Sequence, residues 1–73
     1  MKYKYSIQIA WSQEDDAFIA TVPELPGCAA DGVSQEEAIQ NLEVVIDEWI
    51  ATAKELKRPI PPPVSSSRVE MLA

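Results

Sequence analysis

Carboxylates are the most numerous side chains in this sequence that could do chemistry. Twelve Asp and Glu residues stand against six Lys and Arg, there is no histidine, and Cys28 is the only cysteine. A metal-dependent nuclease would need acids gathered into one site, and Asp15, Asp31 and Asp47 are the acids it would use. Nothing in their spacing brings them together, and a nucleophilic Cys28 would have no imidazole as its base. We therefore expect no catalysis and no bound metal or cofactor, and keep the nuclease as an alternative.

The acids between residues 36 and 48 instead follow a helical spacing. They lie beside an apolar stripe and face outward, so they do not converge on a pocket. They either keep the protein soluble or form a contact surface for a partner, with Val44 as a single exposed valine or as the apolar centre of that surface. We favour the contact surface and expect the flank formed by Glu36, Glu43 and Asp47 to be exposed. Its residues are Glu36, Glu43 and Asp47 on one flank and Glu37, Val44 and Glu48 on the outer side.

Charge restricts the class of partner. The net charge is −6 and the pI is about 4.3. A nucleic-acid binder needs cations to replace the counterions of phosphates, so we expect no direct binding of DNA or RNA. An acidic protein favours a basic protein partner through complementary potential.

Length and cysteine usage restrict the fold and the compartment. Seventy-three residues make one small domain with a small core, and neither a disulfide nor a histidine-containing zinc site can reinforce it. Self-association, as a homodimer or homotetramer, is the reinforcement that remains. No apolar run approaches the ~20 residues of a membrane span, no signal peptide is visible, and one unpaired cysteine suits a reducing cytoplasm.

Three strands are predicted before residue 33. Residues 3–11 alternate, with Tyr3, Tyr5 and Trp11 on the apolar face, and this predicts a half-buried strand with these aromatic side chains in the core. A polar run with three acids, residues 12–16, predicts a hairpin connection. Residues 17–22 are apolar on both faces and predict an interior strand, which the prolines and glycine of residues 23–27 then break. Residues 28–31 predict a third strand, with Asp31-Gly32 as its closing turn.

A long helix follows and determines the fold class. Ser34 is the expected N-cap with Glu37 as its capping-box partner, and an apolar stripe that includes Trp49 continues for about 23 residues until Pro59. The prolines of residues 59–64 predict an extended segment laid against the domain. A short edge strand at Val64 or at residues 69–72 could pair with this sheet or with a neighbouring subunit. The expected fold is α+β: a three-stranded antiparallel sheet packed on one long helix, with a domain at 1–64 and a tail at 65–73.

Three motifs in this order resemble the N-terminal domain of the HicB-like antitoxins. They are PELPGC at residues 23–28, EEA at residues 36–38 and IPPP at residues 60–63, and the likeness covers about residues 3–65. The resemblance implies a reduced ribonuclease-H-like arrangement and a function by binding, because members of that family block HicA toxins, which are small basic ribonucleases. Many relatives add a C-terminal DNA-binding domain, for which a chain ending at Ala73 has no room, so we expect no autoregulation by this chain alone.

Two alternatives to the antitoxin remain besides the nuclease. One is an orphan HicB-like domain that has no toxin and binds something else, and the other is a purely structural oligomer. A basic reading frame next to the gene would favour the antitoxin, and its absence would favour the orphan.

Overall fold

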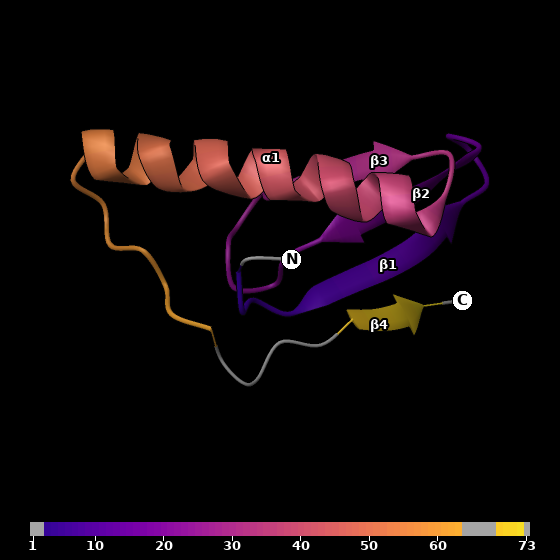
Figure 1. Ribbon diagram of the computed structural model, residues 1–73, viewed down its shortest axis with the longest axis horizontal. Coiled ribbons are helices and arrows are strands. Elements are labelled where there is room, and N and C mark those ends of the chain that lie inside the picture. The colour runs from indigo at the N-terminus through magenta and orange to yellow at the C-terminus, as the bar shows by residue number, and fades with distance from the viewer. Residues whose placement is uncertain (1–2, 64–68, 73) are drawn as a thin grey trace.

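The computed structural model describes residues 3–63 and 69–72, and in this part of the chain one helix lies across one face of a small sheet (Figure 1). The fold is the predicted α+β arrangement of a three-stranded antiparallel sheet and a long helix, with one further strand at the sheet edge. The elements are β1 (Ile7–Ser12), β2 (Ala17–Thr21), β3 (Ala29–Gly32), α1 (Gln35–Glu55) and β4 (Val69–Leu72), and the strand order is β3-β2-β1-β4.

The β1–β2 hairpin confirms the predicted turn and the interior position of β2. Strands β1 and β2 are antiparallel, with Trp11 opposite Phe18, and the turn between them contains the acidic run. Strand β1 begins later than predicted, at Ile7, although Tyr5 is buried and Tyr3 is half-buried. The alternation that predicted a strand from residue 3 therefore reflects the burial of these tyrosines, which lie before β1 in a segment without strand pairing.

Strand β4 pairs with β1 of the same chain. The pairing is parallel, with Ile7 opposite Val69 and Ala10 opposite Leu72. Strand β1 therefore has a neighbour on both sides, so β4 and not β1 is the edge strand on this side of the sheet. The alternative strand at Val64, and the boundary between the domain 1–64 and the tail 65–73, lie outside the described residues.

Residues 23–27 form the predicted break between β2 and β3. Gly27 has a φ of 77°, and the amide of Val22 donates to the carbonyl of Cys28 across the base of the loop at 3.1 Å. Leu25, in the middle of the loop, is fully buried, so the loop is fixed to the core. Strand β3 then begins at Ala29 and continues through Gly32. The prediction that Asp31-Gly32 is a turn is wrong, because both residues pair with β2 and the chain turns at residues 33–34.

Helix α1 begins at the predicted N-cap. The Oγ of Ser34 accepts a hydrogen bond from the amide of Glu37, and the Oε1 of Glu37 accepts one from the amide of Val33, each at 3.1 Å. In a capping box the side chain of Glu37 would accept from the amide of Ser34. Here it accepts instead from the amide of Val33, the residue before the N-cap.

The C-terminal end of α1 is closed without glycine. Lys57 takes a φ of 56°, the amide of Arg58 donates to the carbonyl of Ala53, and the amide of Lys57 donates to the carbonyl of Lys54. This is the Schellman arrangement, which normally places glycine at the left-handed position. The helix therefore ends before Pro59, through its own backbone hydrogen bonds.

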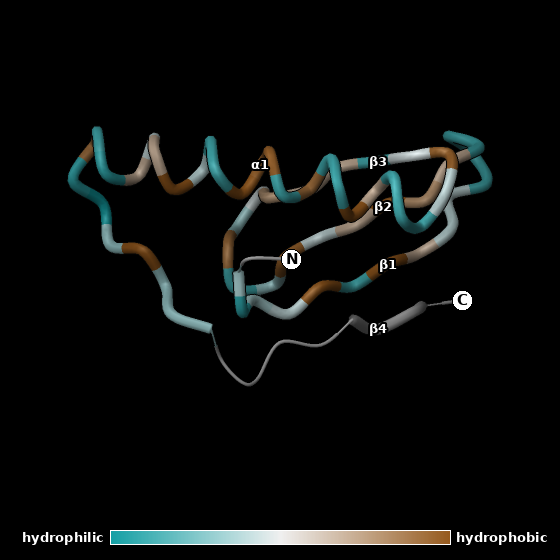
Figure 2. The backbone as a smooth tube through the Cα atoms, in the orientation of Figure 1, coloured by the Kyte–Doolittle hydropathy of each residue, from teal (hydrophilic) through white to brown (hydrophobic). Residues whose placement is uncertain are grey.

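The core lies between α1 and the sheet face beneath it. Apolar residues of α1 line the side of the helix that faces the strands, and hydrophilic residues occupy its outer turns (Figure 2). The extended segment after α1 is held against the domain, since the hydroxyl of Tyr5 donates to the carbonyl of Pro61 at 2.6 Å. The buried cluster contains Tyr5, Ile7, Ile9, Ala20, Val22, Leu25, Cys28, Ala38, Leu42 and Ile46.

Candidate protein-binding surface

The six residues predicted to bind a partner do not form one uniform surface. Glu36, Glu37, Val44 and Glu48 are exposed, and Val44 has 57% of its surface accessible. Glu43 and Asp47 are only half-exposed, so the expectation of a fully exposed flank is wrong for these two.

The N-terminal segment explains the burial of Asp47. The hydroxyl of Tyr3 donates a hydrogen bond to Oδ1 of Asp47, which joins the segment before β1 to this flank of α1. Asp47 therefore has a structural role that helical spacing alone did not reveal. Of the six predicted residues, Glu36, Glu37 and Glu48 supply exposed charges on the outer surface of α1, with Val44 between them.

Trp11 is the largest departure from the sequence-based expectation for this surface. Alternation predicts it in the core, but 46% of its surface is exposed. Its ring packs edge-to-face on Phe18, with ring centroids 5.0 Å apart and an interplanar angle of 70°. The first turn of α1 lies over Gly32 of β3, where an added Cβ would be 2.4 Å from the nitrogen of Ala38. With strands about 4.8 Å apart, Trp11 on β1 lies roughly 10 Å across the sheet from that point and is left uncovered.

Sequence reasoning also missed Val33. It connects β3 to α1 and is the most exposed of the large apolar residues in the described part of the chain, at 77%. One signal in the sequence could have predicted this exposure: the valine stands between a glycine and the N-cap serine, outside both the strand pattern and the helix pattern. Gly32 lies opposite Phe18, and Phe18 lies opposite Trp11, so Val33 follows the last residue of this row.

Acidic residues surround this end of the sheet. Glu14, Asp15 and Asp16 are exposed in the hairpin turn next to Trp11, and Glu36 and Glu37 are exposed in the first turn of α1. The turn itself is ordered by local bonds, since the Oγ of Ser12 donates to Oδ2 of Asp15 at 2.8 Å.

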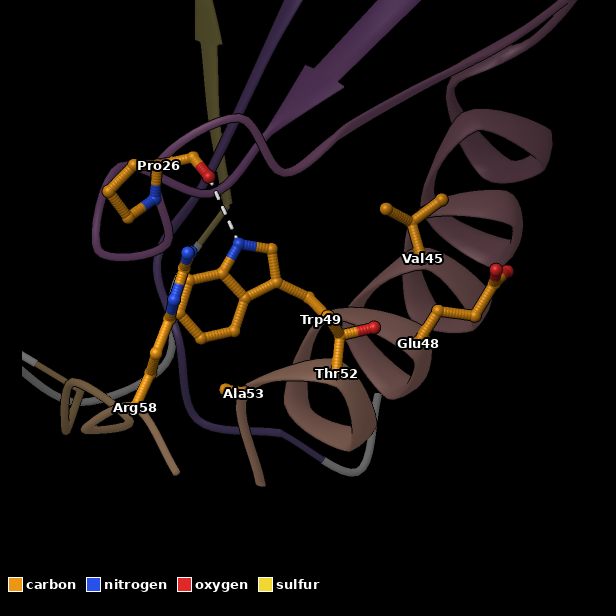
Figure 3. Close-up of a pocket in the computed structure, with 7 residues that line it drawn as sticks. All are labelled: Pro26, Val45, Glu48, Trp49, Thr52, Ala53 and Arg58. Atoms are coloured by element: carbon orange, nitrogen blue, oxygen red, sulfur yellow. Dashed lines mark hydrogen bonds between the residues drawn. The ribbon is translucent and has the colours of Figure 1, made fainter. Parts of the chain in front are cut away.

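A hollow of about 380 Å³ lies along the flank of α1 that carries Trp49 (Figure 3). The indole of Trp49 points into the space between Pro26 and the helix, and its Nε1 donates to the carbonyl of Pro26 at 3.0 Å. Trp49 thus ties the 23–27 loop to α1 and packs against the core, as predicted. The polar lining of the hollow consists of Thr52, Glu48 and Arg58. Glu48 and Arg58 are oppositely charged and exposed, and this lining has no thiol or imidazole that could act as a nucleophile or a base near neutral pH.

The alternative nuclease site is not assembled by this fold. Asp15 lies in the hairpin turn, Asp31 on β3 and Asp47 on α1 next to Tyr3. Among residues 3–63 and 69–72, no three Cys, Asp or Glu residues lie close enough together to hold a metal ion. Cys28 is buried, and burial raises the pKa of its thiol, so the reactive thiolate is disfavoured at neutral pH.

No helix in the described part of the chain is long and apolar enough to cross a membrane.

Comparisons with known proteins assign most of the chain to one sequence family. The sequence model of a family described as UPF0150-like matches residues 7–62. A UPF0150 protein of Thermoplasma acidophilum is 34% identical over 58 residues, which are 80% of this chain and 83% of that protein. A UPF0150 protein of Synechocystis is 36% identical over 47 residues, which are 64% of each chain. Neither name states an activity or a partner, and no solved structure matches.

Proposed function

The chain belongs to the UPF0150-like family, and from this premise we propose that it is a non-catalytic antitoxin that binds and neutralises a small basic ribonuclease of the HicA type. The proposal joins two supports. The first is the resemblance of its motifs to the HicB-like antitoxins, to which this family is related. The second is the distribution of charge on the folded chain.

The acidic outer surface is the observation that carries the proposal. Glu36, Glu37 and Glu48 along α1 and the acids of the hairpin turn are exposed, on a chain with a net charge of −6. A ribonuclease is basic where its RNA lies. An acidic protein is therefore attracted to that same surface, and its binding there excludes the RNA. The rigid helix α1 holds its charges at a fixed spacing.

The absence of an assembled catalytic site from the described residues is consistent with a function by binding. The acids that a nuclease would need lie on three different elements, and the thiol of Cys28 is buried. We expect the purified chain to leave RNA and DNA intact in the presence of magnesium or manganese. Cleavage that disappears in Asp31→Asn or Asp47→Asn would instead support the nuclease.

Association kinetics with the basic protein encoded beside this gene test the proposal. We expect a stable complex whose association rate falls as salt rises, because exposed charges accelerate encounter. Glu36→Lys combined with Glu48→Lys should slow association about tenfold at low salt, and much less at high salt. Both residues are exposed, so the fold should survive, and circular dichroism checks it. Asp47 is left unchanged because reversing it would also break its bond to Tyr3.

A matched double variant separates the loss of the two charges from their reversal. Glu36→Gln with Glu48→Gln keeps the shape of both side chains and should give an intermediate rate. If the folded lysine variant associates as fast as the parent at both salt concentrations, the outer surface of α1 takes no part in the encounter. If the parent forms no complex, or no basic reading frame adjoins the gene, the orphan binding domain becomes the better description.

Self-association as a homodimer or homotetramer remains a proposal. Helix α1 covers one face of the sheet, and in the described part of the chain no helix covers the other (Figure 1). That open face includes the half-buried side chains of Ala10, Ile19 and Thr21. Sedimentation at micromolar concentration should show a dimer or a larger species, whereas a heat-stable monomer would contradict it.

A further inference from the structure

The β1–β2 turn and the start of α1 lie at the same end of the sheet (Figure 1). Trp11, Phe18 and Gly32 lie in a row across β1, β2 and β3, and Val33 follows Gly32. We call Trp11, Phe18 and Val33 the hairpin-end patch. It arises because the first turn of α1 crosses β3 and leaves β1 uncovered at this end.

The members of the patch have the properties of a binding anchor. Trp11 is 46% exposed and Val33 is 77% exposed, so both side chains have apolar surface that a partner could bury. Phe18 packs against the core and supports the indole edge-to-face, so the ring of Trp11 is held before any partner arrives. Tryptophan is enriched among the few interface residues that carry most of the binding energy, and a preordered side chain loses less entropy on binding.

The acids around the patch determine the class of occupant. Glu14, Asp15 and Asp16 follow β1 on one side, and Glu36 and Glu37 begin α1 on the other. A second copy of this chain would place like charges opposite each other, which opposes self-association at this end. A basic protein would instead match the acidic rim while its apolar surface covers the indole.

We propose that the hairpin-end patch is the anchor for the basic protein partner, with Trp11 inserted into an apolar pocket of that partner. The inference rests on the proposed function and assigns the contact that holds the complex together. The acids of α1 and of the hairpin turn then govern the rate of encounter, and the patch governs the rate of dissociation.

Val44 is the matched alternative anchor. It is also exposed, at 57%, but its helical neighbours three and four residues away are Gln40, Asn41, Asp47 and Glu48, all of them polar. A valine in a polar surrounding offers little apolar area to a partner, whereas Val33 directly follows Gly32, the residue opposite Phe18. The two valines therefore distinguish the hairpin-end patch from the outer surface of α1.

Binding of alanine variants to the HicA-type protein encoded beside this gene tests the proposal. Trp11→Ala should weaken the affinity about 30-fold, mostly through faster dissociation. Val33→Ala should weaken it about fivefold, and Val44→Ala should leave it within about twofold. Val33 is 77% exposed, so its variant stays informative even if Trp11→Ala disturbs the hairpin, which thermal unfolding would reveal.

Fluorescence gives a second readout. The chain has two tryptophans, so Trp49→Phe leaves Trp11 as the only indole. Its emission should shift to the blue when the basic protein is added, because the ring moves from water into an apolar pocket. The Trp11→Phe variant, which retains the indole of Trp49, should show no such shift.

The outcomes separate this inference from the proposed function. No complex with the parent chain contradicts both. A complex that is weakened by Val44→Ala but not by Trp11→Ala or Val33→Ala, without a shift in Trp11 emission, retains the proposed function and overturns the hairpin-end patch as the anchor. A loss of affinity in the Trp11 and Val33 variants, with the shift, supports it.

Discussion

Gly32 lies so close to Ala38 that a Cβ on the glycine would be 2.4 Å from the backbone nitrogen of Ala38 and 2.8 Å from the carbonyl carbon of Glu37. The last residue of β3 thus touches the first turn of α1 through backbone atoms. Neither neighbour can rotate away, as a long side chain could. This contact positions the start of α1, with its acids, at the end of the sheet.

Gly32→Ala should therefore lower the free energy of unfolding by about 2–3 kcal/mol, as overpacking of a rigid contact does. Denaturant unfolding followed by circular dichroism measures the change. Gly27→Ala is the matched comparison, because Gly27 has a φ of 77° and a Cβ added there would meet no other atom within 4 Å. Its cost should be only the backbone strain, about 1 kcal/mol. Equal effects of the two substitutions would show that the helix start can shift.

Lys57→Gly should stabilise the protein. Lys57 holds the left-handed position of the helix C-terminus at a φ of 56°, where glycine has no steric penalty. We expect a gain of about 0.5–1 kcal/mol in the free energy of unfolding. Lys57→Ala removes the same charge without relieving the backbone, so it should not stabilise. If glycine and alanine act alike, the effect comes from the charge.

Stability should decline in alkaline solution because of two buried groups that ionise there, the thiol of Cys28 and the hydroxyl of Tyr5. Burial raises the pKa of Cys28, and burial together with the charge of Glu24 raises the pKa of Tyr5. In the unfolded chain these groups lose their protons near 9.0 and 10.0, while the folded chain still retains them. The folded state therefore binds more protons in this range, and the free energy of unfolding falls as pH rises above the unfolded pKa values. Below them the two groups are protonated in both states and contribute no pH dependence.

Unfolding midpoints at about pH 7.5 and about pH 10.5 check this prediction. Cys28→Ala and Tyr5→Phe should each lose part of the alkaline decline, although Tyr5→Phe also removes the bond to Pro61 and is less stable at both pH values. If the variant with both substitutions lost as much stability at alkaline pH as the parent, other groups would be the cause of the decline.

The sequence predicts most of the fold because its local signals agree. The Ser34 cap, the apolar stripe of α1 and the alternation around Ile7 and Ile9 each indicate an element that the structure contains. The predicted boundaries fail where tertiary contacts decide. Tyr5 is buried and Tyr3 is half-buried without strand pairing, and Gly32 extends β3 because the passing helix requires a residue without a side chain.

The candidate surface is less predictable, since it depends on how α1 crosses the sheet. Alternation places Trp11 on the same face as Ile9, but only the crossing of the helix decides which of the two is covered. The bond between Tyr3 and Asp47 joins residues 44 positions apart, which no local pattern reports. Exposure of Glu36, Val44 and Glu48 could be predicted because it follows from helical spacing alone.

RNA cleavage by the neighbouring basic ribonuclease, measured while this chain is added in increasing amounts, tests the central claim most directly. We predict that cleavage falls in proportion to the added chain and stops near the equivalence point, because each bound chain covers one RNA-binding surface. The chain alone should leave the RNA intact. Undiminished cleavage in the presence of an excess of folded chain would contradict an antitoxin function.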